Sequence, residues 1–290
     1  MLQILFIGLN DDQVPYLNAL KKLGYYIIGI DKNRFAPGVG LVDLYINHGY
    51  DEYLEIEHVI SCNSDLKPNA VFTASAQFSH VLASRLAKLY DLPYPSERLV
   101  ETILDKTKFY NFFSVHGLPI PNTSYVASQN ELDQFLENSP EEQRYYIKSD
   151  YSKNPNYVYS GTAKSLLETQ INWDKDTYLR SCYAVQPEIV GPSLRINIMG
   201  AESEVYDFNS GLKLLLLDQN VSKIVTQLRT FCETVGLAGW VVKFDVIDTQ
   251  NSFATLDIGI DPPSRMRRKF ICKGQDFEKY YLEKYLDVFE

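Results

Sequence analysis

The sequence predicts an α/β protein, and three observations carry this prediction. The first ~95 residues alternate apolar, strand-like runs with helical patterns, as in an open parallel sheet. Near the end of the chain, two apolar runs flank a short polar turn at residues 248–252, which is typical of a β-hairpin. The composition, 45% hydrophobic and 22% charged over 290 residues, is that of a globular chain with one large domain or two to three small ones.

The N-terminal part supplies the elements of the parallel sheet. Strands and helices are expected in alternation, at residues 2–7 (strand), 12–23 (helix), 25–30 (strand), 54–62 (helix), 70–73 (strand) and 78–90 (helix). Ligands of such sheets bind beyond the carboxyl ends of the strands. This rule predicts a polar crevice that contains Leu9, Asn10, Asp31, Ser75 and Gln77.

The middle of the chain begins with a linker. Prolines in Leu92–Ser96 favour an extended segment, and Ser96 is expected to cap a helix that runs to about Val115. Gly117–Pro121 then breaks that helix. Three more elements are predicted further on: a helix capped by Ser128, a strand at residues 145–148 and a helix at residues 221–235.

The acidic hairpin near the C-terminus is the most informative feature of the chain. Its strands are expected at residues 241–247 and 254–260. Because side chains alternate between the two faces of a strand, Asp257, Gly259 and Asp261 share one face.

The pairing of the two strands decides what this face can hold. If the hairpin closes symmetrically about Gln250, Asp245 pairs with Thr255 and lies diagonal to Asp257. Asp245, Asp257 and Asp261 then form a set of three carboxylates within reach of one cation. Hard oxygen ligands suit Mg²⁺ held together with substrate phosphates, so the hairpin points to nucleotide chemistry.

Composition and charge exclude several classes of protein. The net charge of −9 argues against a general nucleic-acid binder. No apolar run approaches the ~20 residues of a membrane span, and the first residues predict a buried strand rather than a signal peptide. The four cysteines form no C-x-x-C pair, which is typical of reduced thiols in a cytoplasmic protein, and neither they nor the four histidines have zinc-ligand spacing.

A dinucleotide site on the first strand is disfavoured by the turn that follows it. Only Gly8 of the G-x-G-x-x-G fingerprint is present, and Asp11 and Asp12 lie where a pyrophosphate would approach the helix. An NAD-linked or sugar-nucleotide enzyme on this sheet therefore stays a minor alternative.

Several short motifs follow one another in a definite order. They are Asp105–Lys108, Gly117–Pro121, Tyr146–Lys148, Gln186–Gly191 with Arg195, Gly236–Gly239, and Asp245 with Asp257. This order resembles the ATP-grasp superfamily of carboxylate–amine ligases, in particular its carbamoyl-phosphate-synthetase-like and PylC-like members. The resemblance implies a pre-ATP-grasp domain at residues 1–95, a linker helix and small lobe at 96–184, and a C-terminal lobe with the Mg-ATP site at 185–290.

The resemblance also implies roles for residues of the nucleotide site. Lys106 matches a lysine that contacts ATP phosphates in relatives, and Lys148 matches the lysine that reaches the α-phosphate and the adenine side. Gln186 to Ile189 match the hinge that holds the adenine edge. Glu188 or Ser193 would bind the ribose.

A second set of residues matches the chemical centre of the family. Arg195 matches an arginine that stabilises the transferred phosphoryl group, and Asp245 and Asp257 match the acidic Mg²⁺ ligands. Each has a plainer interpretation as well. Lys106 could be an exposed helix lysine, Arg195 a surface residue, and Asp257 a charge partner of Lys243 across the hairpin.

The chain departs from the family pattern at its most important positions. Relatives usually carry Glu-x-Asn-x-Arg where this chain has Asp257, Gly259 and Asp261. Asp261 is expected to supply the lost metal oxygen, and Arg265 or Arg267 the lost positive charge. The loop at residues 149–161, normally rich in glycine, is bulky here.

The resulting hypothesis is an ATP- and Mg²⁺-dependent ligase that joins small amino-acid-like substrates. Its substrates are expected near Asn10, Ser75 and Gln77, with Arg267 in the basic run 265–269 holding a carboxylate; a solvated loop is the alternative for that run. A degenerate, non-catalytic nucleotide-binding protein is the main alternative function. Many relatives are dimers, so the resemblance leaves a homodimer open.

Overall fold

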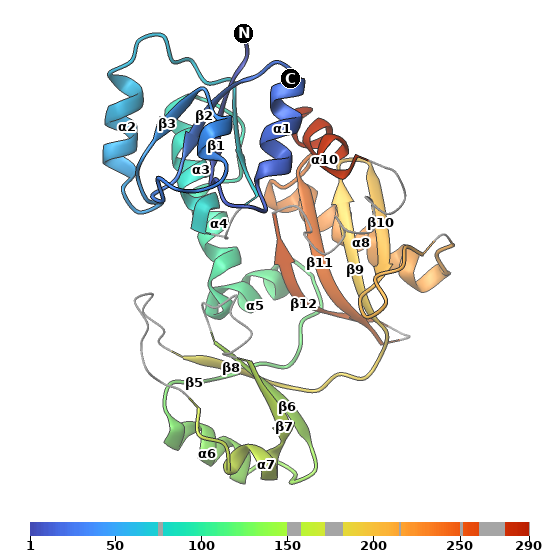
Figure 1. Ribbon diagram of the computed structural model, residues 1–290. Helices are drawn as coiled ribbons and strands as arrows, with labels where there is room; N and C mark the ends of the chain where they lie inside the picture. The colour runs from blue at the N-terminus through green and yellow to red at the C-terminus, as the bar shows by residue number, and fades with distance from the viewer. Residues whose placement is uncertain are drawn as a thin grey trace.

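The computed structural model describes residues 1–74, 78–149, 158–171, 182–214, 216–249, 252–260 and 276–289. Within these ranges the chain forms three four-stranded sheets (Figure 1). One sheet is parallel and N-terminal, and the two that follow it are antiparallel, so the expected α/β class is confirmed. No helix in the described part is both long and apolar enough to cross a membrane.

The N-terminal domain is built on the parallel sheet, with strand order β3-β2-β1-β4. Its elements are β1 (Gln3–Ile7), α1 (Val14–Lys22), β2 (Tyr26–Ile30), the 3₁₀ turn η1 (Val39–Leu41), β3 (Leu44–Ile46), α2 (Tyr53–Ser61), β4 (Ala70–Thr73) and α3 (Phe78–Leu89). The central strands are buried on both faces, which explains their continuous apolar sequence. Strand β3 was not expected, because its three residues are too few to show a pattern.

Two helices connect this domain to the rest of the chain: α4 (Glu97–Leu104), which Ser96 caps as expected, and α5 (Lys106–Val115). The single helix expected from Ser96 to about Val115 is wrong at Asp105. Asp105 has an extended backbone, and its carboxylate accepts hydrogen bonds from the N–H (3.0 Å) and hydroxyl (2.6 Å) of Thr107. It therefore ends the first helix and caps the second.

The small lobe is the antiparallel sheet with strand order β5-β8-β6-β7 and its two helices. Its elements are β5 (Ser124–Val126), α6 (Gln129–Glu137), β6 (Arg144–Ser149), β7 (Val158–Thr162), α7 (Ala163–Leu167) and β8 (Tyr183–Pro187). Ser128 caps α6 as expected. Strand β8 runs across the domain boundary expected after residue 184, because it pairs with both β5 and β6.

The C-terminal lobe contains the second antiparallel sheet, with strand order β10-β9-β11-β12. Its elements are β9 (Ser193–Met199), β10 (Glu202–Asp207), α8 (Gln219–Val235), β11 (Val241–Asp248), β12 (Phe253–Gly259) and α10 (Phe277–Leu286). Helix α8 buries one apolar face and ends at Gly236, whose positive φ of 82° suits glycine. Helix α10 lies against the N-terminal domain, where Tyr285 meets Phe72 edge to face at 4.8 Å (Figure 1).

The acidic hairpin forms as expected, but in a different register. Asp245 pairs directly with Asp257, and Val246 pairs with Thr255, so the expected pairing of Asp245 with Thr255 is wrong. One extra residue, Leu256, stands between these two pairs on β12. Next to the turn the pairing is already shifted by one position relative to symmetrical closure about Gln250, and this β-bulge shifts every residue beyond it by one position more.

Contacts outside the hairpin account for the bulge. The carbonyl of Leu256 accepts a hydrogen bond from the Tyr110 hydroxyl at 3.2 Å, and the N–H of Thr255 donates to the carbonyl of Pro119 at 2.8 Å. Both partners belong to the segment around α5. The backbone groups that the bulge leaves unpaired are therefore satisfied by tertiary contacts that the hairpin sequence alone does not reveal.

Candidate functional site

One row of side chains crosses the sheet of the C-terminal lobe. Arg195 on β9 is the cross-strand partner of Asp245 on β11, and Asp245 is the partner of Asp257 on β12. Cross-strand partners project from the same face of a sheet. The alternate residues, such as Ile196 and Phe244, are buried on the opposite face. The strand pattern therefore gathers one guanidinium and two carboxylates in a single line.

The Arg195–Asp245 pair is a two-point ion pair. Nε and Nη2 of Arg195 donate to the two carboxylate oxygens of Asp245, each at 2.7 Å. The side chains are 14% and 18% exposed, so solvent screens the pair only in part. This fork geometry fixes the orientation of both groups, and it is the arrangement by which arginine also binds phosphate.

Lys106 reaches the same row from α5. Because Asp105 caps this helix, Lys106 is its first residue, and its ammonium forms an ion pair with Asp257. The same ammonium lies 4.4 Å from the centre of the Phe109 ring. Burial raises the pKa of the Asp257 carboxyl, but the charges of Lys106 and Lys243 outweigh it, so the net pKa is lowered.

Lys148 approaches from the small lobe. The alternation of β6 buries Tyr145, Ile147 and Ser149 in that lobe and leaves Lys148 half-buried on the other face. Burial lowers the pKa of its ammonium to about 8, and the positive charge of Lys106 acts in the same direction. The carboxylates of Asp257 and Asp245 oppose this shift, which shows that Lys148 is within electrostatic reach of the row.

The described part of the chain thus brings three basic side chains and two carboxylates to one place. They come from α5, β6 and the sheet of the C-terminal lobe, elements far apart in sequence (Figure 1). Lys243, whose charge also acts on Asp257, adds a fourth cation, so with all six groups ionised the positive charges exceed the negative by two. Such a cluster suits a polyanion, which would remove the repulsion between Lys106 and Lys148.

Two hinge residues expected to hold a nucleotide already have partners. The side-chain amide of Gln186 donates to the Thr123 hydroxyl at 2.8 Å, and its carbonyl accepts from Tyr110 at 3.4 Å. Glu188 forms an ion pair with Arg144 at 3.2 Å. The side chain of Gln186 therefore links β8 to α5 and β5, and only its backbone remains for the expected adenine contact.

The rest of the hinge leads into the C-terminal lobe. Ile189 is half-buried, and Ser193 opens β9 as the partner of Ile247. Between them, Gly191 lies so close to the carbonyl of Asp248 that a β-carbon would overlap it. The hinge is thus fitted tightly against the end of β11 at a position where only glycine fits.

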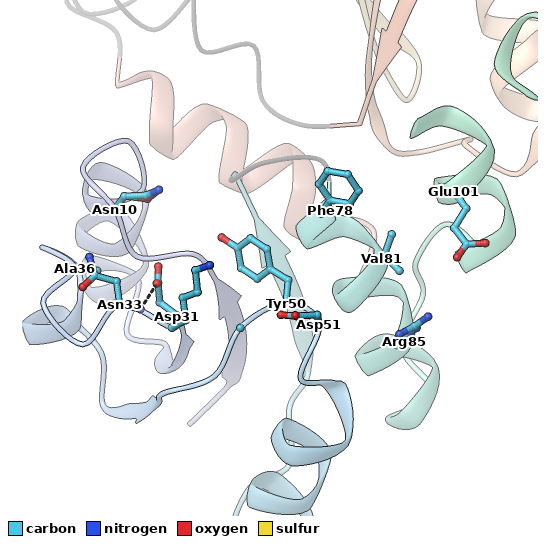
Figure 2. A pocket seen from close by; sticks show the side chains of 12 residues that line it. Asn10, Asp31, Asn33, Ala36, Tyr50, Asp51, Phe78, Val81, Arg85 and Glu101 are labelled. Carbon is cyan, nitrogen blue, oxygen red and sulfur yellow. Dashed lines mark hydrogen bonds between the residues drawn. The ribbon is translucent and has the colours of Figure 1, made fainter. Parts of the chain in front are cut away.

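The expected crevice of the N-terminal domain is a real cavity, with a volume of about 530 Å³. Asn10 and Asp31 line it where β1 and β2 end, as the position of these strands predicted (Figure 2). Their role toward a substrate stays a prediction. Five other expected site residues lie outside the described residues: Ser75, Gln77, Asp261, Arg265 and Arg267.

The first turn of this domain uses its backbone donors internally. The N–H of Leu9 donates to the Asp31 carboxylate at 2.7 Å, and the N–H of Asn10 donates to Oε1 of Gln13 at 3.1 Å. A dinucleotide pyrophosphate needs such N–H groups at the start of the helix. The turn therefore offers no phosphate cradle at these two residues, in line with its poor sequence fingerprint.

Some cavity residues were not anticipated. Tyr50 and Asp51 follow the unexpected strand β3, while Phe78 begins α3 and Glu101 lies on α4. The signal for the first two is faint: a short apolar triplet, Leu44–Ile46, followed by a polar turn. Nothing in the sequence pattern indicates that α4 turns Glu101 toward the carboxyl ends of the strands.

The carboxylates of the row fit a divalent cation only in combination with a ligand. Among the described residues, no group of three His, Cys, Asp or Glu side chains comes together. Asp245 and Asp257 face each other as a pair, and Mg²⁺ is commonly bound through one or two carboxylates plus phosphate oxygens. The pair therefore fits a magnesium ion that arrives with a nucleotide.

No family model and no curated protein matches the sequence, whereas many solved structures match the fold. The L-amino acid ligase of Bacillus licheniformis superposes with a TM-score of 0.73 at 12% identity, over 99% of this chain and 74% of its own. N5-carboxyaminoimidazole ribonucleotide synthetase of Thermotoga maritima superposes with a TM-score of 0.70 at 17% identity, over 98% of this chain and 76% of its own. These neighbours are ATP-grasp enzymes. This chain has the ATP-grasp fold.

A third structure with the ATP-grasp fold shows what such a fold can hold. The biotin carboxylase domain of the Hydrogenobacter thermophilus 2-oxoglutarate carboxylase was crystallised as a dimer with MgADP, ADP and bicarbonate. It superposes with a TM-score of 0.71 at 15% identity, over 97% of this chain and 68% of its own. Identities this low establish the shared fold and leave activity to the residues of this chain.

Proposed function

We propose that this protein is an ATP-dependent carboxylate–amine ligase that forms an amide bond through an acyl phosphate. The observation that carries the proposal is the row Arg195, Asp245 and Asp257, with the ammonium group of Lys106 paired to Asp257 and that of Lys148 within electrostatic reach of the row. These residues supply the positive charge and the carboxylate pair that transfer of a phosphoryl group requires.

The proposed reaction has two steps. A carboxylate oxygen of the first substrate attacks the γ-phosphorus of ATP, the bond to the β-phosphate oxygen breaks, and ADP leaves. The amine nitrogen of the second substrate then attacks the carbonyl carbon of the acyl phosphate. The C–N bond forms, the C–O bond to phosphate breaks, and the amine loses its extra proton to solvent. Phosphorylation is needed because the carboxylate oxygen alone is a very poor leaving group.

The basic residues of the site would bind and orient the phosphates. Lys106 begins the connecting helix α5 and Lys148 lies on β6 of the small lobe, so together they would hold a phosphate tail from two sides. Arg195, kept in one orientation by Asp245, would stabilise the negative charge on the transferred group. Asp245 and Asp257 would hold Mg²⁺, which when bound neutralises phosphate charge. Little covalent chemistry is asked of the protein, so positioning dominates.

The hinge and the N-terminal cavity complete the proposal. The backbone of Gln186 to Ile189 would hold the adenine edge, and Glu188 or Ser193 the ribose. A small amino-acid-like substrate would lie near Asn10, which lines the cavity in the N-terminal domain. Arg265 is proposed to supply the positive charge that an arginine supplies in relatives, and Arg267 is proposed to bind the substrate carboxylate.

A homodimer is proposed as well, since the biotin carboxylase neighbour crystallised as a dimer. Light scattering would check this proposal.

The first experiment is Mg-ATP binding by calorimetry, followed by ADP release in the presence of pools of amino acids. Wild type is compared with Lys148→Ala and with Lys164→Ala, an exposed lysine of the same lobe that pairs with Glu141 at 3.6 Å. We expect binding that is lost in the first variant and kept in the second, and ADP release that needs one pool. Absence of nucleotide binding by the wild type would refute the function.

A second candidate is a nucleotide-binding protein without ligase activity. The observation that favours it is Gly259, which occupies the position two residues after Asp257 and has no side chain to act as a metal ligand. Saturable ATP binding with no ADP release from any amino-acid pool would support this candidate. If ADP release is seen, Asp245→Asn and Asp257→Asn are the control for it. Under the ligase hypothesis both variants must reduce turnover while leaving the fold intact.

A further inference from the structure

The cavity of the N-terminal domain is large enough for a small organic molecule. Its volume of about 530 Å³ is in the range of ~300–1,000 Å³ found for ligand pockets. Loops at the ends of β1 and β2 and after β3 form one side, and helices α3 and α4 form the other (Figure 2). Tyr50 and Phe78 contribute aromatic rings, and Val81 contributes an aliphatic side chain.

Two backbone donors that could bind a phosphate are already used at this site. As shown above, Asp31 and Gln13 accept the N–H groups of Leu9 and Asn10, two residues of the turn that follows β1. Asp31 accepts a further N–H from Asn33 at 2.8 Å and is 8% exposed, so its charge is directed into the protein. The N–H groups of this turn are therefore bound by Gln13 of the turn itself and by Asp31 after β2, which places a carboxylate where a phosphate would need a donor.

The guanidinium that α3 contributes to the cavity lining, that of Arg85, is neutralised by a carboxylate of the protein. Nε and Nη2 of Arg85 contact one carboxylate oxygen of Glu97, at 2.7 and 2.6 Å. The lining then presents Asp51 and Glu101, both exposed carboxylates that carry no ion pair within the described part of the chain. Against them stands one further cation of the lining, Lys32. The charge balance of the cavity is thus negative, which disfavours phosphorylated and other anionic ligands.

Aromatic rings and carboxylates together are the groups that recognise an organic ammonium ion. The ring face carries negative charge density, which attracts a cation, while the carboxylates supply direct charge pairing. We propose that this cavity binds a small organic molecule through its ammonium group, held between the Tyr50 and Phe78 rings and the carboxylates of Asp51 and Glu101. Resting on the proposed ligase function, this ligand is the amine-bearing substrate, and a ribonucleotide phosphate is excluded as its occupant.

The test uses three probes and needs no ATP. Butylammonium, its neutral counterpart 1-pentanol and ribose 5-phosphate are titrated separately into the full-length protein and followed by NMR. The methyl resonances of Val81, identified by their loss in Val81→Ile, report binding inside the cavity. We expect saturable shifts with butylammonium, at least about fivefold weaker binding of 1-pentanol, and no saturation with ribose 5-phosphate. Equal affinity for the three probes, or preference for the phosphate, would overturn the proposal.

Charge variants locate the interaction. The double variant Asp51→Asn, Glu101→Gln should weaken butylammonium binding by about fivefold, the effect expected of two solvent-exposed charge pairs. Asp65→Asn, an exposed carboxylate outside the cavity, is the matched control and should bind as wild type does. Lys32→Gln should strengthen binding, because it removes the competing cation. Unchanged affinity in the double variant would contradict the proposed role of the carboxylates.

Failure of this site and failure of the ligase hypothesis give different results. Ammonium binding at Val81 without any ATP binding would leave the cavity assignment intact and remove its link to ligase chemistry. ATP binding with amine-dependent ADP release, but no ammonium shift at Val81, would keep the function and refute the cavity as the amine site. If both hold, the double variant should raise the KM for the amine and leave the KM for ATP unchanged.

Discussion

The lowered pKa of Lys148 leads to a quantitative prediction about nucleotide binding. In the free protein, burial and the neighbouring Lys106 charge lower this pKa to about 8. A phosphate placed against the ammonium favours its charged form and raises the pKa again. Binding of Mg-ATP near Lys148 must therefore be coupled to proton uptake from solution.

The size of the effect follows from the free-state pKa of about 8. If the bound-state pKa is above the range studied, uptake equals the deprotonated fraction of free Lys148. That fraction is about 0.1 proton per site at pH 7, about 0.5 at pH 8 and about 0.9 at pH 9. The direction of the pH dependence is also fixed. Because the bound state holds more protons, the affinity for Mg-ATP falls as the pH rises through 8. Between pH 8 and pH 9 the dissociation constant should increase about fivefold.

Calorimetry in buffers of different ionisation enthalpy measures this uptake directly, since the slope of the observed enthalpy is the number of protons bound. Lys148→Arg is the control, because a guanidinium stays charged throughout this range. Its uptake should be near zero at all three pH values. A wild-type uptake that does not change with pH, or one that persists in Lys148→Arg, would refute the placement of Lys148 against the phosphates.

Three further predictions test single contacts of the structure. Asp257→Asn should reduce ADP release at least about 100-fold with an unchanged circular dichroism spectrum, since it removes the Lys106 partner and a proposed metal ligand; near-normal turnover would contradict the assignment. Gly191→Ala should lower the free energy of unfolding by about 2 kcal/mol and the Tm by roughly 5 °C, because the added β-carbon would overlap the carbonyl of Asp248. Gly40→Ala is the control: its added β-carbon meets no atom within 4 Å, so neither quantity should change. Tyr110→Phe should lower the free energy of unfolding in urea by about 1–2 kcal/mol, because it removes the one hydroxyl proton that is shared between Gln186 on β8, at 3.4 Å, and the carbonyl of Leu256 on β12, at 3.2 Å. A change below a few tenths of a kcal/mol would show that this shared hydrogen bond contributes little.

The sequence predicts well those features that depend on neighbouring residues. The alternating elements of the N-terminal sheet, the cap at Ser128 and the existence of the acidic hairpin all follow from local pattern. The crevice position of Asn10 and Asp31 follows as well, because the ends of parallel strands meet at one edge of a sheet. Each of these predictions requires only the periodicity of a segment and the identity of the residues at its two ends.

Features that depend on distant partners could not be predicted in the same way. The register of the hairpin depends on a bulge at Leu256, whose carbonyl bonds to Tyr110, a residue 146 positions away. The pairing of Lys106 with Asp257 spans 151 positions. Motif order alone placed both residues in one site, through the family resemblance, but it gave no indication that they contact each other.

The bulge has a direct consequence for the site. Under symmetrical closure Asp245 would face Thr255, and Asp257 would lie one diagonal step further away. A one-residue shift at the turn and the extra residue of the bulge together bring Asp257 level with Asp245 instead, which places both carboxylates in the row that Arg195 begins. The contact that holds the bulge, from Tyr110 on α5, belongs to the same helix whose first residue is Lys106.

Helix α5 therefore fixes the site in two ways, since it sets the register of the carboxylates and supplies their counter-ion. Lys148, by contrast, belongs to the small lobe and has only long-range electrostatic links to the row. Its ammonium is repelled by Lys106 and attracted by the two carboxylates, and its lowered pKa shows that these attractions do not offset burial and repulsion. A polyanion between the lobes would change that balance, because it would attract Lys106, Lys148 and Arg195 at the same time. The charge of the cluster, rather than any single contact, is thus what would couple binding in this site to the approach of the small lobe.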